Sequence, residues 1–169
     1  MLKIIKPKSH EDLQQTRTLI CESVDWLRCH YPDHLPVINE YFEGQAFQQE
    51  LDNLLGYYAP PEGCLLLAIK DERAAGCIAL RKLTTAICEM KRLFVRTEFQ
   101  RQGIGLALTK AIIQEAKAIG HPQMRLDTGM QQIGAQRLYQ KLGFKPIKPY
   151  YALSETLRNG LVFMELDLS

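Results

Sequence analysis

The sequence predicts a single α/β domain whose elements follow the order βααβββαβαββ. Apolar residues recur at helical spacing between Leu13 and Leu27, which indicates a helix. Beyond Gly63 the pattern changes to apolar runs of strand length that are joined by short polar turns. Residues 89–144 then alternate strands with helices, and a loop that contains two glycines joins the first of these strands to the first helix. A chain of 169 residues without repeats or linkers is long enough for one domain with a substantial core.

The N-terminal third predicts a short strand and two helices. We expect the strand at residues 1–5. Ser9 begins a capping box, so a helix should start there and continue to about His30. A second helix is predicted after Pro36, ending near Gly56.

The rest of the chain predicts six strands and two helices. The first three strands form an antiparallel meander and are expected at Cys64 to Lys70, Ala74 to Lys82 and Ala86 to Val95. The later elements are a helix at 104–118, a strand at 124–127, a helix at 132–142, and strands at 144–147 and 161–168. The polar segment from Ser154 to Asn159 contains no predicted element.

Composition narrows the function classes. The hydrophobic fraction of 46%, the charged fraction of 24% and the net charge of +2 are those of an ordinary globular protein. There is no basic stripe of the kind that binds nucleic acid. The longest apolar runs, such as Cys64 to Ile69, have strand length, so no membrane association is expected.

Cysteine usage indicates a reducing compartment. Five cysteines in no disulfide spacing, and an N-terminus without an apolar signal segment, predict a cytoplasmic location. Cys88 has no histidine in a recognisable triad order and is expected to be a buried, inert thiol. Cys29, His30 and His34 lack a second ligand pair, so no metal is expected.

The segment from Gln100 to Gly105 joins a strand to a helix. Two glycines allow close approach to the backbone, and the free N–H groups at the start of a helix attract anions such as phosphate. Alternatively, Gly103 and Gly105 only shape a tight turn. Leu106 stands where a P-loop requires lysine, and Leu108 where a dinucleotide fingerprint requires a third glycine. Neither of those two phosphate motifs is present.

Two motifs together resemble the signatures of the GCN5-related N-acetyltransferases (GNAT). Gln100-Arg101-Gln102-Gly103-Ile104-Gly105 is similar to that family's coenzyme A pyrophosphate loop, and residues 135–144 resemble its A-x-x-L-Y-x-K-L-G-F helix. The resemblance implies a mixed, mostly antiparallel sheet flanked by helices, whose fourth and fifth strands splay apart to admit acetyl-CoA, with no metal. It assigns cofactor binding to Leu93, Phe94, Val95, Gln100, Arg101, Gln102, Gly103, Ile104, Gly105, Gln132 and Tyr139. Three positions depart from the usual pattern: Gln132 replaces a frequent asparagine, Thr97 a common proline, and Gln100 is the less basic of the two permitted residues.

Acetyl transfer to an amine needs a base and an acid, because an amine of pKa ~10.4 is almost fully protonated at neutral pH. By the resemblance, Glu89 is the candidate base and Tyr139 the candidate acid for the departing thiolate. Strand alternation predicts that Glu89 shares a face with Lys91, Leu93 and Val95. The alternatives are a salt-bridged Glu89 and a Tyr139 that only packs in the core.

The resemblance therefore predicts an N-acetyltransferase that moves the acetyl group of acetyl-CoA directly to a primary amine. The acceptor is a small metabolite or a peptide, and a homodimer is left open. One alternative is a non-catalytic acyl-CoA-binding or regulatory module on the same fold. Another is a nucleotide-binding protein unrelated to acyl transfer.

Overall fold

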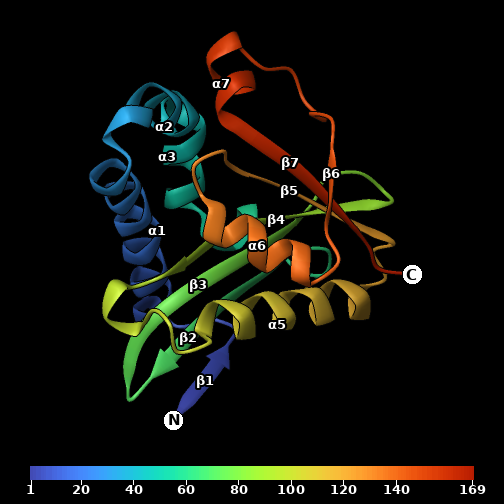
Figure 1. The fold of residues 1–169 in the computed structure, drawn as a ribbon. Coiled ribbons are helices and arrows are strands. Elements are labelled where there is room, and N and C mark those ends of the chain that lie inside the picture. The colour runs from blue at the N-terminus through green and yellow to red at the C-terminus, as the bar shows by residue number, and fades with distance from the viewer.

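The computed structural model describes residues 1–169 and forms one seven-stranded sheet with helices on both faces (Figure 1). The strands are β1 (Leu2–Ile5), β2 (Cys64–Lys70), β3 (Arg73–Lys82), β4 (Ile87–Val95), β5 (Gln123–Gly129), β6 (Lys145–Ile147) and β7 (Leu161–Asp167). They lie in the order β1-β2-β3-β4-β5-β7-β6, and every neighbouring pair is antiparallel except β4 with β5. The mixed, mostly antiparallel sheet is confirmed.

The helices divide between the two faces of this sheet. They are α1 (His10–His30), α2 (Leu35–Phe42), α3 (Gln45–Asp52), α4 (Leu54–Tyr57), α5 (Ile104–Ile119), α6 (Ile133–Lys141) and α7 (Glu155–Gly160), with short 3-10 helices η1 (Pro32–His34) and η2 (Thr97–Phe99). One core cluster joins α1, α3 and α4 to β2 and β3, and a larger one joins α5 and α6 to the opposite face. None of these helices combines the length and apolarity needed to cross a membrane.

The N-terminal helices differ from the prediction in one respect. Ser9 caps α1 as expected, because its hydroxyl accepts from the N–H of Asp12 at 3.0 Å. The single helix predicted between residues 36 and 56 is wrong, since α2, α3 and α4 occupy this segment. Gly44 takes a positive φ of 89° between α2 and α3, and Asn53 caps α4 by accepting from Gly56 at 3.1 Å. The breaks at Gly44 and Asn53 are local, and a new helix begins directly after each of them.

Helix α7 was not predicted. The Ser154 hydroxyl accepts from the N–H of Leu157 at 3.2 Å and so caps a helix within the polar segment. The same hydroxyl donates to Glu40 on α2 at 2.5 Å. The short helix is therefore held against α2, whose sequence lies more than a hundred residues away.

Strand β4 contains a β-bulge at Arg92 and Leu93. Cys77 pairs with Phe94 and Ala79 with Lys91, so two residues of β4 lie opposite one residue of β3. Arg92 adopts a positive φ of 62° at this point. The extra residue reverses the alternation of side chains along the strand.

The bulge corrects the expectation that four residues of β4 share a face. Leu93 and Val95 pack against the core cluster that contains α5. Lys91 instead contacts Tyr41 of α2, on the opposite face. Simple alternation failed because a bulge is set by contacts with other elements and leaves no periodic signal.

A buried ion pair holds the side chain of Arg92, one of the two bulge residues. Arg92 donates from Nε and Nη2 to the two carboxylate oxygens of Glu50 on α3, at 2.7 and 2.8 Å. Tyr58 donates its hydroxyl to the same carboxylate at 2.7 Å. Burial alone would raise the pKa of Glu50, but the hydrogen bonds and charge of Arg92, with the Tyr58 hydrogen bond, lower it below its usual value.

Beyond the first three residues, β4 and β5 separate. Their parallel pairing covers only Ile87 to Glu89 on β4 and Gln123 to Arg125 on β5. Both strands continue past this point, to Val95 and Gly129. The expected splay between the fourth and fifth strands is therefore present, and it opens beside the bulge.

We expect Glu50→Gln to lower the free energy of unfolding by about 3 kcal/mol at neutral pH, because it leaves Arg92 buried without its carboxylate. The lowered pKa of Glu50 adds stability above its unfolded-state pKa of ~4.3, and this stability is lost as the pH falls through the folded-state value. The difference between wild type and variant should therefore shrink on acidification, as measured by urea unfolding over a pH series.

Glu62→Gln is the matched control for this prediction. Glu62 pairs with Lys82 at 2.7 Å, but the two side chains are 49% and 40% exposed. An exposed pair contributes at most about 1 kcal/mol. Equal losses of stability in the two variants would contradict a structural role for the buried pair.

Candidate active site

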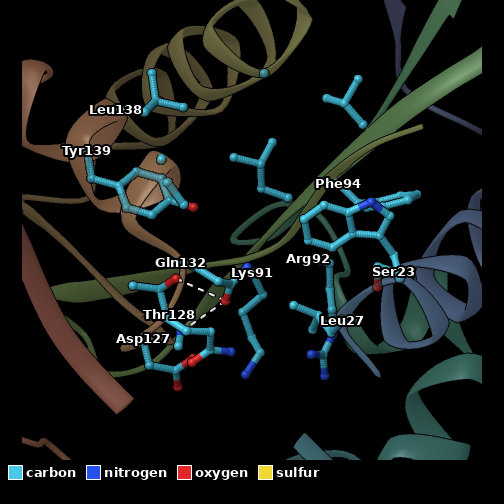
Figure 2. A pocket seen from close by; sticks show the side chains of 18 of the residues that line it. Ser23, Leu27, Lys91, Arg92, Phe94, Asp127, Thr128, Gln132, Leu138 and Tyr139 are labelled. Atoms are coloured by element: carbon cyan, nitrogen blue, oxygen red, sulfur yellow. Dashed lines mark hydrogen bonds between the residues drawn. The ribbon is translucent and has the colours of Figure 1, made fainter. Parts of the chain in front are cut away.

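One cavity of about 590 Å³ occupies the space between the separated ends of β4 and β5 (Figure 2). It extends from the loop before α5, past β4 and α6, to α1 and α2 on the other side of the sheet. Figure 2 shows Leu138 and Tyr139 of α6 toward one end of the cavity and Lys91 and Asp127 toward the other. The separation of β4 and β5 thus forms a passage that is lined by helices from both faces of the sheet.

The loop before α5 presents a run of free backbone N–H groups. No N–H from Arg101 to Leu106 donates to another backbone group, and the N–H of Ala107 is the first to do so, to Gly103 at 3.0 Å. The backbone turns here through positive φ values of 63° at Arg101 and 79° at Gly103. These donors, with the positive end of the α5 dipole behind them, form a site suited to an anion such as phosphate.

The side chains of this loop leave space beside the backbone. A Cβ atom on Gly105 would lie 3.8 Å from Val95, which is an ordinary contact. Gln100 donates its amide to the carbonyl of Val95 at 3.0 Å and so ties the loop to the end of β4. Gln102 donates to the carbonyl of Glu98 at 3.3 Å and does not line the cavity.

Tyr139 lies on α6, which is followed two residues after its end by Gly143 with a positive φ of 101°. Its ring is buried against Phe144, with 5.7 Å between the ring centroids. Its hydroxyl points into the cavity in Figure 2. Burial, together with the negative charge of Asp127, raises the pKa of Tyr139, so the phenol is protonated at neutral pH and can donate a proton.

Gln132 fastens the start of α6 to the end of β5. Its side-chain oxygen accepts from the N–H of Gly129 at 3.0 Å and from the hydroxyl of Thr128 at 3.3 Å (Figure 2). It does not cap α6 through its side chain. The residue lines the cavity while it fixes the wall opposite β4.

Glu89 is buried and engaged on both carboxylate oxygens. Arg81 donates to Oε1 at 2.7 Å, Tyr150 donates to Oε2 at 2.6 Å, and the Lys91 ammonium lies 3.7 Å from Oε1. Burial alone would raise the pKa of Glu89, but the charge of Lys91, the Tyr150 hydrogen bond and Arg81 bring it below its usual value. Glu89 does not line the cavity. This geometry is that of a salt-bridged strand residue.

Asp127 is the carboxylate that does line the cavity. It lies on β5 past the last pair with β4, and it accepts from the hydroxyls of Tyr41 and Tyr151, each at 2.6 Å. Tyr41 also accepts a hydrogen bond from Lys91 at 3.2 Å. An anionic and a cationic side chain are therefore joined through one hydroxyl at the α2 end of the cavity.

The sequence analysis missed Asp127 and Tyr41. Asp127 had a usable signal, because it ends the predicted strand at 124–127 and alternates away from its apolar neighbours. Tyr41 had none, because its partner Asp127 is 86 positions away. On the strand before this one, at 86–95, Glu89 is the one carboxylate.

Comparison with known proteins identifies the family. A sequence model of the Acetyltransferase (GNAT) family matches residues 22–144, which include β4, α5, β5 and α6. The chain belongs to the GNAT family. An uncharacterised N-acetyltransferase of Schizosaccharomyces pombe is 40% identical over 128 residues, which cover 74% of this chain and 76% of that protein.

Solved GNAT structures share the fold along the whole chain. An acetyltransferase of the GNAT family from Staphylococcus aureus superposes with a TM-score of 0.75, at 22% identity and with full coverage of both chains. The PaiA N-acetyltransferase from Thermoplasma acidophilum, solved in complex with coenzyme A, gives a TM-score of 0.73 at 22% identity over 99% of each chain. These likenesses agree with the α/β architecture described above.

Most residues predicted from the GNAT signatures gather around the one cavity. The lining includes Leu93, Phe94, Val95, Gln100, Arg101, Gly103, Ile104, Gly105, Gln132 and Tyr139. Gln102 and Glu89 lie outside it. The two signatures are therefore brought together in space, although a strand and a helix separate them in the sequence.

The cysteine thiols lie apart from this GNAT cavity. None of the five cysteines lines it. Cys88 is fully buried, and burial raises the pKa of its thiol to about 12, so it is not ionised at neutral pH. No three His, Cys, Asp or Glu side chains lie together as a metal ion would require.

Proposed function

We propose that this protein transfers the acetyl group of acetyl-CoA to a primary amine by direct attack, without a covalent enzyme intermediate. The observation that carries the proposal is the continuous cavity between β4 and β5, which joins the free N–H groups before α5 to the hydroxyl of Tyr139. A cofactor with an anionic end and a reactive end some distance away matches such a passage.

The pyrophosphate of coenzyme A would bind the N–H groups of residues 101–106, where the α5 dipole favours negative charge. The pantetheine arm would follow β4 beside Leu93 and Val95, which have lost β5 as a neighbour. Gln132 and Tyr139 would border the arm from α6. The thioester would then lie beside the bulge.

At the thioester, the amine nitrogen forms a bond to the carbonyl carbon, and the carbon–sulfur bond breaks. The developing negative charge on the carbonyl oxygen would be stabilised by the backbone N–H of Leu93 at the bulge. Tyr139 would give its proton to the departing thiolate, a role that its orientation in the cavity supports.

The amine must also lose a proton. Glu89 was the candidate from the family resemblance, but it lies outside the cavity and is paired with the cations of Arg81 and Lys91. Asp127 lines the cavity and keeps acceptor capacity, since each carboxylate oxygen can accept more than one hydrogen bond. We therefore assign the proton-accepting role to Asp127.

The test of the proposed function is release of free thiol from acetyl-CoA with a panel of amino acids, polyamines, aminosugars and short peptides, corrected for hydrolysis. Release with at least one acceptor class is expected, with the acetylated amine confirmed by mass spectrometry. Calorimetric binding of acetyl-CoA without any release would favour a non-catalytic acyl-CoA-binding module. Absence of binding would overturn the proposal, and competition by ATP or NAD would favour a nucleotide-binding protein.

Gly105→Asp sharpens that test. A carboxylate at the second helical position is favourable for α5 itself, but it would repel the pyrophosphate. We expect acetyl-CoA affinity to fall by about tenfold or more at unchanged stability. Gln114→Asp adds the same charge at an exposed site farther along α5 and should leave affinity unchanged.

We expect Tyr139→Phe to lower kcat by about 10²-fold, the usual contribution of a positioned acid, while acetyl-CoA affinity changes little. The fold should persist, because the Tyr139 hydroxyl makes none of the hydrogen bonds that hold Tyr41, Tyr150 and Tyr151. Steady-state kinetics and calorimetry on the same preparation check both quantities. An unchanged kcat would remove the acid role.

Asp127→Asn and Glu89→Gln separate the two carboxylates. We expect Asp127→Asn to lower kcat/KM by about 10²-fold. Glu89→Gln should mainly lower the free energy of unfolding, because it removes the carboxylate partner of Arg81 and Lys91. Kinetics and urea unfolding of both variants are the measurements. A folded Glu89→Gln protein with the larger kinetic loss would return the base role to Glu89.

A further inference from the structure

The acceptor end of the cavity combines an apolar wall with charged side chains. We call this end the acceptor pocket and define it by Trp26, Leu27, Ile38, Tyr41, Lys91 and Asp127. Trp26 and Leu27 come from α1, Ile38 and Tyr41 from α2, Lys91 from β4 and Asp127 from β5. Three apolar residues and two opposite charges thus line the same cavity from these four elements.

Two nearby carboxylates already have a cation of their own. Glu50 holds Arg92 through two hydrogen bonds of 2.7 and 2.8 Å. Glu89 holds Arg81 at 2.7 Å. These two pairs are close to neutral as units and offer little charge to a substrate.

Asp127 is in no ion pair, and Lys91 shares the carboxylate of Glu89 with Arg81. The Lys91 side chain is 13% exposed, and its ammonium lies 3.7 Å from Glu89, a longer contact than the one Arg81 makes. Lys91 and Asp127 form no direct ion pair, because the hydroxyl of Tyr41 stands between them, 3.2 Å from Nζ and 2.6 Å from Oδ1. The separation of Nζ from Oδ1 cannot exceed the sum of these two distances.

Such a spacing suits a ligand that carries both charges on one carbon. A zwitterion placed beside Tyr41 could direct its ammonium to Asp127 and its carboxylate to Lys91 with both contacts at hydrogen-bonding distance. The third substituent on that carbon would then face Trp26, Leu27 and Ile38. Burying an apolar group there is favourable, whereas a further charge would lose its hydration.

We propose that the acceptor is a free α-amino acid with an apolar side chain. The proposal rests on the proposed acetyl transfer and names the substrate of that same site. The α-ammonium would lose one proton to Asp127, and the neutral nitrogen would bond to the acetyl carbon as the carbon–sulfur bond breaks. The thiolate of coenzyme A would take the proton of Tyr139, and the second proton lost by the nitrogen would restore the Tyr139 hydroxyl. The product is an N-acetyl amino acid, which has lost the positive charge that Asp127 binds and so leaves more readily.

Other amines fit the acceptor pocket less well. A polyamine would bring a second cation toward Lys91, and like charges in a partly buried site repel. A peptide N-terminus carries an uncharged amide where a free amino acid carries its carboxylate, and so it forgoes the charge-assisted hydrogen bond to Lys91. Lys91 is therefore the residue that decides between these substrates.

The test compares three acceptors with one side chain, namely L-leucine, L-leucinamide and 3-methylbutylamine, by free-thiol release. We expect kcat/KM for leucine to exceed that of the other two by about tenfold or more, the value of one charge-assisted hydrogen bond. In Lys91→Met this preference should fall to about threefold or less. No preference in wild type, or a preference that survives Lys91→Met, would overturn the inference.

Lys82→Met is the matched control, because Lys82 is exposed on β3, outside the cavity, and pairs only with Glu62. It should keep the full preference for leucine. L-aspartate and L-lysine should be acetylated at least about tenfold less efficiently than leucine, and the reverse order would overturn the apolar assignment. Acetylation of other amines without the leucine preference defeats this inference alone, whereas no transfer to any amine defeats the proposed function as well.

Discussion

The buried ion pair between Glu50 and Arg92 is the contact on which the site depends. Arg92 adopts a left-handed backbone conformation, which is unfavourable for a residue with a side chain, so the surrounding structure must hold it there. Glu50 does so with two hydrogen bonds, and Phe42 and Phe47 pack around the guanidinium at 5.3 and 5.1 Å. Helix α3 therefore enforces the bulge that turns Leu93 toward the cavity and accompanies the separation of β4 from β5.

The two ends of the cavity present different kinds of polar group. At the α5 end the donors are backbone N–H groups, which depend on the course of the chain around Arg101 and Gly103 rather than on side chains. At the α2 end the polar groups are the side chains of Lys91 and Asp127. The backbone donors depend little on side-chain identity, whereas the polar groups at the α2 end change when one residue is replaced.

Tyrosine hydroxyls separate the two carboxylates near the cavity. Tyr150 donates a hydrogen bond to one oxygen of Glu89 and Arg81 to the other, so this carboxylate is engaged in contacts within the fold. Tyr41 and Tyr151 orient Asp127 but leave it facing the cavity. Burial raises the pKa of both Tyr150 and Tyr151, which keeps these hydroxyls as hydrogen-bond donors. Two acids of similar chemistry thus have different surroundings, and only one remains open to a ligand.

The sequence by itself determined the features that depend on neighbouring residues. The cap at Ser9, the meander from Cys64, the loop at residues 100–105 and the helix around Tyr139 follow from local periodicity, turn chemistry and short motifs. Only the tertiary structure decided the bulge, the confinement of Glu89 and the joining of Lys91 to Asp127. Each of the three involves a contact across 42 to 86 positions, such as Glu50 with Arg92 and Tyr41 with Asp127, and a contact between distant residues leaves no pattern in either segment alone.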